Sequence, residues 1–165
     1  MEKVLVIARH KENIDWANGY DSRVIIQKDV DIPNQGRESS SYAWYIIQNY
    51  DNLPDNVTFC QGNPFEHIES IDTPFTEGIV PHGRIYQSDH KGNPHHPQLQ
   101  IAELAHELGI EIPEPLDFIV GAQFTVNKSL ILKHSKGFYV KLYELANNYK
   151  DAPWILERLW LYIFK

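Results

Sequence analysis

Two charged residues stand in an otherwise apolar segment near the end of the chain. Glu157 and Arg158 are the only charges within WILERLWLYIF, residues 154–164. Burying a carboxylate without a partner is costly, so Glu157 must either pair with a cation or border a cleft. One interpretation is a structural ion pair with Arg158. The other is a pocket carboxylate that can take a proton. The spacing leaves both open.

Two polar glycine loops are the next candidates for chemistry. Residues 34–39 (NQGRES) precede a predicted helix, and residues 61–64 (QGNP) follow a predicted strand. A glycine loop that leads into a helix offers free N–H groups to a phosphate, and Arg37 could add a bidentate contact. An ordinary capped turn is the alternative for each loop. Neither loop has the spacing of a Walker A or GxGxxG motif.

Signals for a metal or a nucleophile are weaker. Asp29 and Asp31 could chelate a divalent ion, but aspartates are also common in turns. A second segment, rich in histidine, also holds side chains that could bind a metal, but their spacing is not that of a zinc site. These residues are Asp89, His90, His95 and His96. The chain has no GxSxG or HExxH motif. Cys60 lies in a predicted buried strand, where it is expected to pack rather than react.

The elements that must position these groups alternate between strand and helix. Strands are predicted at residues 3–8, 23–27 and 57–60, and a short helix at 15–19. Between the last two strands, an apolar stripe that includes Ile46 and Tyr50 predicts an amphipathic helix, with residues 39–41 as serine N-caps. This alternation favours an α/β fold with a parallel sheet. Both glycine loops then lie at one edge of the sheet, where open α/β folds bind ligands.

The second half has a less regular pattern. Residues 66–96 hold prolines, glycines and histidines and predict a long loop, which in a compact domain is usually functional or mobile. A helix is expected at 99–108, ended by Gly109. Residues 118–126 read as an apolar strand with a bend at 121–123. Two more helices are expected, one with a stripe from Phe138 to Tyr149 and a last, mostly buried one opening at 151–153.

Composition narrows the class of protein. The 165 residues fit one domain, residues 1–165, and 42% hydrophobic content predicts a folded chain. The net charge of -7 excludes nucleic acid as an expected partner, because its binding needs a basic face. A single cysteine favours a reducing compartment, so a cytoplasmic location is expected. The apolar run at the start is too short for a signal sequence or a membrane span.

Several motifs together resemble one uncharacterised family. They are PNQGRE at residues 33–38, YDNLP at 50–54, FCQGNP at 59–64, GAQFTV at 121–126 and ERLWLYIF at 157–164. This is a domain-of-unknown-function family grouped with GT-A glycosyltransferases. The likeness covers nearly the whole chain in order and is weakest over residues 66–115. It implies a small single-domain GT-A-like α/β fold with a mostly parallel central sheet flanked by helices.

The resemblance also implies a nucleotide-sugar donor, of the UDP or GDP type, and a glycan or other hydroxyl acceptor. In GT-A enzymes the ends of the first two strands hold the base and ribose, and the loop before the next helix closes over the nucleotide. Carried onto this sequence, the implied donor-binding residues are Ala8, Arg9, Glu12, Lys28, Asp29, Asn34, Gly36 and Arg37, joined by the QGNP loop residues Gln61, Gly62 and Asn63.

The position of the Asp-x-Asp metal motif of GT-A enzymes departs from that pattern, because it reads Gln61-Gly62-Asn63. These side chains lack the carboxylates that Mn²⁺ or Mg²⁺ prefers, so cations such as Arg9, Lys28 or Arg37 are expected to neutralise the diphosphate instead. The resemblance further implies Glu157 as general base, with Gln123 and His90 as acceptor or sugar contacts.

The expected activity is therefore hexosyl or pentosyl transfer from a nucleotide-sugar. Two alternatives stay open. One is a non-catalytic module of the same fold that binds a nucleotide or glycan. The other is a metal-dependent hydrolase that uses the histidine-rich loop.

Overall fold

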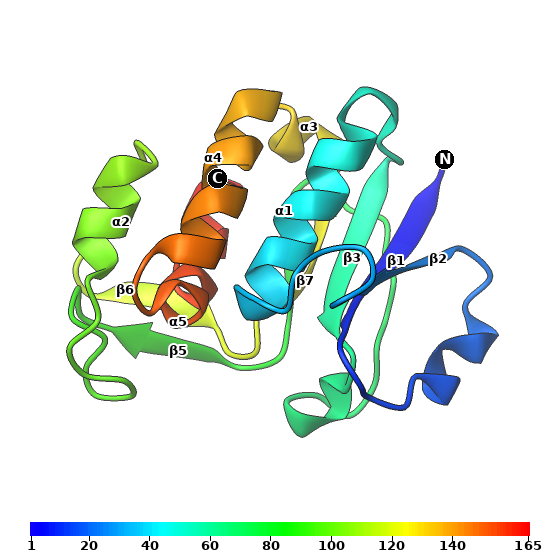
Figure 1. Ribbon diagram of the computed structural model, residues 1–165, viewed down its shortest axis with the longest axis horizontal. Helices are drawn as coiled ribbons and strands as arrows, with labels where there is room; N and C mark the ends of the chain where they lie inside the picture. Colours follow the sequence, from blue (N-terminus) through cyan, green and yellow to red (C-terminus); the bar gives the residue numbers. More distant parts are fainter.

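The computed structural model describes residues 1–165 as one α/β domain (Figure 1). Its central sheet has five strands in the order β2-β1-β3-β7-β4. In that order, their bounds are Arg23–Gln27, Lys3–Arg9, Asn56–Gln61, Gln123–Asn127 and Ile79–His82. β1 pairs in parallel with β2 and β3, whereas β7 is antiparallel to both β3 and β4. Four strands therefore share one direction, which confirms the mostly parallel sheet.

A separate two-stranded antiparallel sheet is formed by β5 (Ile85–Ser88) and β6 (Leu116–Ile119). The α-helices, in chain order, are α1 Arg37–Asn49, α2 Ile101–Glu107, α3 Lys128–Ile131, α4 Lys136–Asn148, α5 Ala152–Glu157 and α6 Trp160–Ile163. Short 3₁₀ helices are η1 Asp15–Gly19, η2 Tyr50–Asn52 and η3 Pro64–Glu66. None of these helices has the length and apolar character needed to cross a membrane.

Alternation along the strands divides the core between the two faces of the sheet. On one face, Tyr42 of α1 packs against Phe59 of β3 and Phe124 of β7, with ring centroids 4.7 and 5.9 Å apart. Helices α1 and α4 lie side by side over this face (Figure 1). On the other face a smaller cluster contains Ile7 and Cys60 and is covered by residues near η1. The predicted packing of Cys60 is confirmed, since it is fully buried.

Four predicted features of the fold differ from the structure. The strand expected at 118–126 is divided between the two sheets, as β6 and β7, because the chain turns at Gly121 and Ala122, which both have positive φ. The long loop at 66–96 contains the two short strands β4 and β5. The last helix is interrupted at Arg158, so it becomes α5 and α6. Helix α1 begins at Arg37 with Gly36 as its N-cap, and the three serines therefore lie inside its first turns. Ser40 Oγ donates to the Gln35 carbonyl instead of capping the helix, at 2.6 Å.

Candidate functional site

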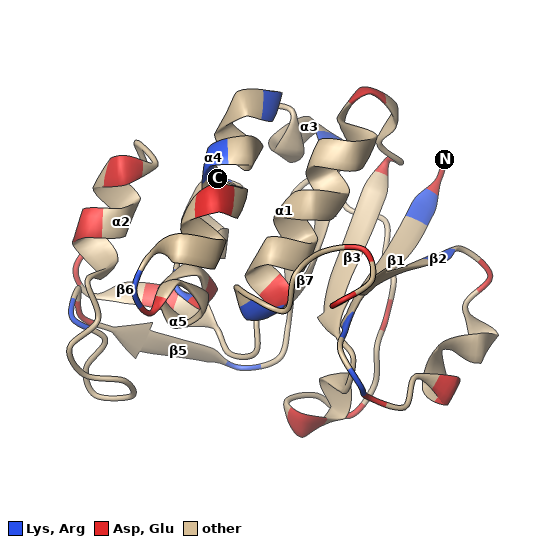
Figure 2. Cartoon of the chain, in the orientation of Figure 1, with Lys and Arg blue, Asp and Glu red and all other residues tan.

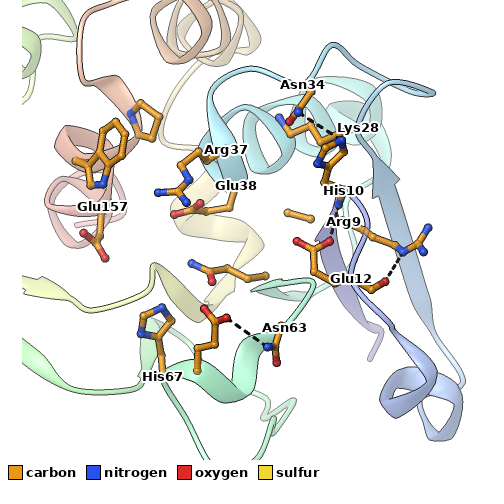
Figure 3. Close-up of a pocket in the computed structure, with 15 residues that line it drawn as sticks. Arg9, His10, Glu12, Lys28, Asn34, Arg37, Glu38, Asn63, His67 and Glu157 are labelled. Carbon is orange, nitrogen blue, oxygen red and sulfur yellow. Dashed lines mark hydrogen bonds between the residues drawn. The ribbon is translucent and has the colours of Figure 1, made fainter.

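One polar pocket with a volume of about 650 Å³ lies beside the carboxyl ends of β1 and β3 (Figure 3). The first turns of α1 and α5 complete its walls. Its lining residues are Ala8, Arg9, His10, Glu12, Lys28, Asn34, Arg37, Glu38, Gln61, Asn63, Glu66, His67, Pro153, Trp154 and Glu157. Charges of both signs adjoin at the start of α1 (Figure 2). The pocket therefore combines four carboxylates with three Lys or Arg side chains, and most of its lining residues are polar.

Most of the residues predicted as a site come together here although they are far apart in the chain. The predicted donor-binding residues that line the pocket are Ala8, Arg9, Glu12, Lys28, Asn34, Arg37, Gln61 and Asn63. Glu157, predicted as the general base, lies on the same pocket from α5 (Figure 3). The predicted residues that do not line it are Asp29, Gly36, Gly62, His90 and Gln123. The roles of all of them stay predictions.

Gly36 and Gly62 support the pocket from behind. Gly36 has φ of 69°, and a Cβ there would lie 2.8 Å from the Cβ of Ser40 and 2.9 Å from the carbonyl oxygen of Ala146. A side chain at Gly62 would come within 2.7 Å of the Glu12 carboxylate. The left-handed φ and the close backbone approach therefore favour glycine at position 36, whereas a side chain at position 62 would displace the Glu12 carboxylate.

Asp29 stands behind two lining side chains and orients them. Its Oδ2 is 3.2 Å from His10 Nε2, and its Oδ1 accepts a hydrogen bond from the Asn34 backbone N–H at 3.2 Å. Asp29 thus acts on the pocket through His10 and Asn34.

Gln123, the first residue of β7, is fully buried. Its side chain bonds both to the end of β3 and to the segment that follows β3. Its Oε1 accepts from the Gln61 backbone N–H at 3.0 Å, and its Nε2 donates to the Pro64 carbonyl at 3.3 Å. It therefore fixes the position of the Gln61 backbone. His90 lies outside the pocket, where its Nδ1 is 2.9 Å from Glu114 and its Nε2 is 2.8 Å from the Pro113 carbonyl.

Arg9 was predicted as a phosphate-neutralising cation, but its guanidinium is occupied elsewhere. Nε donates to the Glu12 carbonyl at 2.8 Å and Nη1 to Gln27 Oε1 at 2.6 Å. In Figure 3 the guanidinium points away from the pocket. The Glu12 carboxylate in turn accepts from the His10 backbone N–H at 2.7 Å. Arg9 and Glu12 thus fix the loop that follows β1.

Lys28 is the buried cation of the site, with only 4% of its surface exposed. Its Nζ donates to the Gln35 carbonyl at 2.5 Å and to Ser40 Oγ. Burial lowers the pKa of this ammonium to about 8, against the smaller raising effects of Glu38 and Asp29. Since an ammonium has three donors, Lys28 can still donate one hydrogen bond to a ligand.

Arg37 and Trp154 meet across the mouth of the pocket. Arg37 is exposed, and its guanidinium carbon lies 5.3 Å from the centroid of the Trp154 ring. The His96 ring approaches Trp154 as well, with centroids 5.3 Å apart. Arg37 forms no salt bridge. Its charge therefore remains available to an anion.

Glu157 combines the two interpretations that the sequence left open. Its Oε1 accepts from Arg158 Nη1 at 3.0 Å, and its Oε2 accepts from the Gly121 backbone N–H at 2.8 Å. Arg158 is buried against Phe118, with 4.4 Å between the guanidinium carbon and the ring centroid. Glu157 is thus both the partner of a buried arginine and a wall of the pocket, in an orientation fixed by two donors.

Six lining residues were missed from the sequence: His10, Glu38, Glu66, His67, Pro153 and Trp154. Glu38 matters most for chemistry, because burial raises the pKa of its carboxyl to about 7. A hydrogen bond from its own backbone N–H lowers this pKa, Glu157 raises it, and Arg37 and Lys28 lower it. The available signal was a glutamate directly after Arg37, which reads equally well as an ordinary acidic first-turn residue.

The predicted metal ligands do not assemble. The chain contains no cluster of three or more His, Cys, Asp or Glu side chains able to hold an ion. Asp31 accepts from the Gln27 backbone N–H, and Asp89 accepts from the backbone N–H groups of Lys91 and Asn93 within a turn. The His95 ring stacks on Tyr86 at 4.8 Å. These side chains support local turns and packing.

Comparison with known families gives one match. Residues 5–79 match the family model described as "Protein of unknown function (DUF3431)". Comparisons with curated proteins and with solved structures give no match. The matched segment runs from β1 to the first residue of β4, and it includes every pocket residue from Ala8 to His67. Twelve of the fifteen lining residues therefore belong to a segment similar to an uncharacterised family, and the other three lie on α5, outside that segment.

Proposed function

We propose that this pocket binds a nucleotide-sugar and transfers its sugar to a hydroxyl group of a glycan, as a small glycosyltransferase of the GT-A type. One observation carries the proposal. The ends of β1 and β3, Lys28 just after β2, the loop before α1 and a carboxylate on a late helix all line a single pocket. The family resemblance implies these same positions for a donor site with an opposed base.

On the donor side, the backbone of Ala8 and the side chains of Glu12 and Asn34 would hold the base and ribose. Arg37 and Lys28 are the cations that can meet the diphosphate, since the guanidinium of Arg9 is occupied. Gln61 Nε2 donates to the Gly121 carbonyl at 2.8 Å, which leaves its Oε1 to accept a sugar hydroxyl.

Glu157 would act as the general base for an acceptor hydroxyl. As the carboxylate takes that proton, the acceptor oxygen attacks the anomeric carbon, and the nucleoside diphosphate leaves with the bonding electron pair. The Gly121 N–H and Arg158 would keep the carboxylate directed at the acceptor. Trp154, three residues earlier on α5, offers an exposed ring to the apolar face of a sugar.

The first test is a thermal-shift panel of UDP-, GDP-, CMP- and dTDP-sugars, each with and without Mn²⁺. A ligand that binds only the folded state adds about 2.7 kcal/mol at 100 times its dissociation constant, which shifts the melting temperature visibly. We expect one nucleotide to stabilise the protein, and the Mn²⁺ dependence to show whether Gln61 and Asn63 serve without a metal. No shift with any sugar nucleotide would count against the donor site.

The base assignment predicts the behaviour of Glu157→Gln. Transfer should fall by about 10²-fold or more, the usual range for a lost general base, while the dissociation constant for the donor changes little. Initial rates with the stabilising donor and calorimetric binding provide the two readouts. Glu144→Gln, an exposed residue on α4, is the matched control. Normal transfer, or a protein that no longer folds, would refute the assignment.

A non-catalytic module of the same fold is distinguished by the same experiments. It would bind the nucleotide-sugar in the thermal-shift panel, yet the wild-type protein would neither transfer the sugar nor consume the donor.

A further inference from the structure

One wall of the pocket carries three charges without an ion-pair partner. Lys28, just after β2, and Arg37 and Glu38, from the start of α1, lie on this wall, and none of the three takes part in a salt bridge. Figure 3 shows Arg37 and Glu38 side by side, both directed into the pocket. Neither carboxylate oxygen of Glu38 is hydrogen bonded to another residue, although the side chain is half-buried. The Glu38 carboxylate and the guanidinium of the exposed Arg37 are therefore open to a ligand that enters the pocket.

Two of these charges favour an anion and the third opposes it. A phosphate that meets Lys28 and Arg37 would lie close to Glu38, where a carboxylate repels it. A protonated carboxyl group instead becomes a hydrogen-bond donor to a phosphate oxygen. We propose that the pocket takes up its anionic ligand, a phosphate ester of the nucleotide-sugar class, together with one proton that Glu38 carries. The proton comes from solvent on binding and returns when the ligand leaves.

The inference rests on the proposed function only for the identity of the ligand. The groups that face Glu38 are Lys28 from the end of β2, its neighbour Arg37, Glu157 of α5 and Tyr42 of α1. The remaining titratable side chains of the pocket are Arg9, His10, Glu12, Glu66 and His67. Burial and Glu157 favour the neutral carboxyl of Glu38, whose pKa of about 7 makes proton uptake accessible near neutral pH. An anion at this wall favours the neutral form further.

The experiment measures binding at pH 6 and pH 8 by calorimetry with UDP-glucose, GDP-mannose, CMP-N-acetylneuraminate and dTDP-glucose, whose phosphate groups do not titrate in this range. For the wild type, the dissociation constant of the ligand that binds should rise about tenfold from pH 6 to pH 8, because Glu38 must take up a proton at the higher pH. Glu38→Gln imitates the neutral carboxyl, so its affinity should vary much less with pH and exceed that of the wild type at pH 8. Glu144→Gln should behave as the wild type does.

A second readout counts protons. Titrations at pH 8 in two buffers with different ionisation enthalpies give the number of protons exchanged on binding. Lys28, with a pKa of about 8, also takes up part of a proton when it meets a phosphate, so we expect the wild type to take up close to one proton more than Glu38→Gln does. The inference is overturned if wild-type affinity is equal at both pH values, or if Glu38→Gln keeps the tenfold change; the donor site then stands. If none of the four compounds binds at either pH, the donor site and the proton-coupled binding both fail.

Discussion

Glu38 and Glu157 are two carboxylates of one pocket in different surroundings. Glu157 receives hydrogen bonds from Arg158 and the Gly121 N–H, whereas Glu38 receives none from another residue. Donors to the charged form favour ionisation, and burial without them opposes it. Pairs of titratable groups whose environments differ in this way often divide acid and base roles between them. In our proposals, Glu157 is the general base of the transfer and Glu38 is the carboxyl group that takes up a proton with the ligand.

The raised pKa of Glu38 predicts a pH-dependent stability. Its folded pKa of about 7 lies above the ordinary value of 4.5. The folded state therefore holds this proton more tightly than the unfolded state does, and loses stability as pH rises from about 4.5 through 7. Glu38→Gln removes that loss. We expect it to raise the free energy of unfolding by roughly 1–3 kcal/mol at pH 8.5, and by clearly less near pH 5.

Urea unfolding of the wild type, Glu38→Gln and Glu144→Gln at both pH values tests this. Equal effects of Glu38→Gln at pH 5 and pH 8.5 would show that its carboxyl titrates in the ordinary range.

At the scale of elements, the strands and helices of the first half of the chain were easier to predict than those of the second half. β1 and β2 have clear apolar runs, and α1 has a 3.6-residue stripe, so local patterns were enough to find them. β4 and β5 are four residues each, and both are too short for a period of two to appear. Pro81 lies within β4, and Gly83 lies between the two strands. Their pairing partners, β7 and β6, lie far along the chain, and a local sequence pattern cannot reveal such a pairing.

Part of the candidate site could likewise be predicted from the sequence, and part could not. Residues at the ends of predicted strands, such as Ala8 and Gln61, were identified because strand ends are defined locally and meet at one edge of the sheet. Glu38 was not, because its position depends on how α1 starts. Gly36 and Arg37 both have positive φ, and these two left-handed residues direct the first turn of the helix toward the pocket. Packing against α4 fixes this start, and the sequence of the loop alone does not indicate it.

Gly36→Ala tests this helix start. The left-handed φ and the contacts of a Cβ with Ser40 and Ala146 should together lower the free energy of unfolding by about 1–3 kcal/mol. Gly19→Ala is the matched control, since a Cβ there meets nothing within 4 Å, and we expect a change within about 0.5 kcal/mol. Chemical unfolding of both variants gives the comparison. Equal small effects would mean that α1 can begin without a glycine.

At the scale of the whole molecule, the reactivity of the single thiol, Cys60, should report the cooperative unfolding of the central sheet. Cys60 is fully buried in β3, the middle strand of the sheet, and burial raises its pKa. Its modification should therefore need unfolding of the sheet, so a disulfide reagent should react roughly 10³-fold or more slowly in native buffer than in concentrated urea. The rate should increase with urea in parallel with global unfolding. Rapid labelling in native buffer would instead reveal local opening between β3 and its neighbours.

The placement of α5 has a consequence for biosynthesis. Ala8 is synthesised well before Trp154 and Glu157, which belong to α5. At about 5–20 residues per second, about 7–30 s separate the synthesis of the two walls. During this interval the nascent chain holds the residues of the strand ends, but it lacks both α4, which fixes the start of α1, and the carboxylate of α5. The pocket becomes complete only once translation has passed α5, so a chain that ends before α5 lacks the wall that carries Trp154 and Glu157.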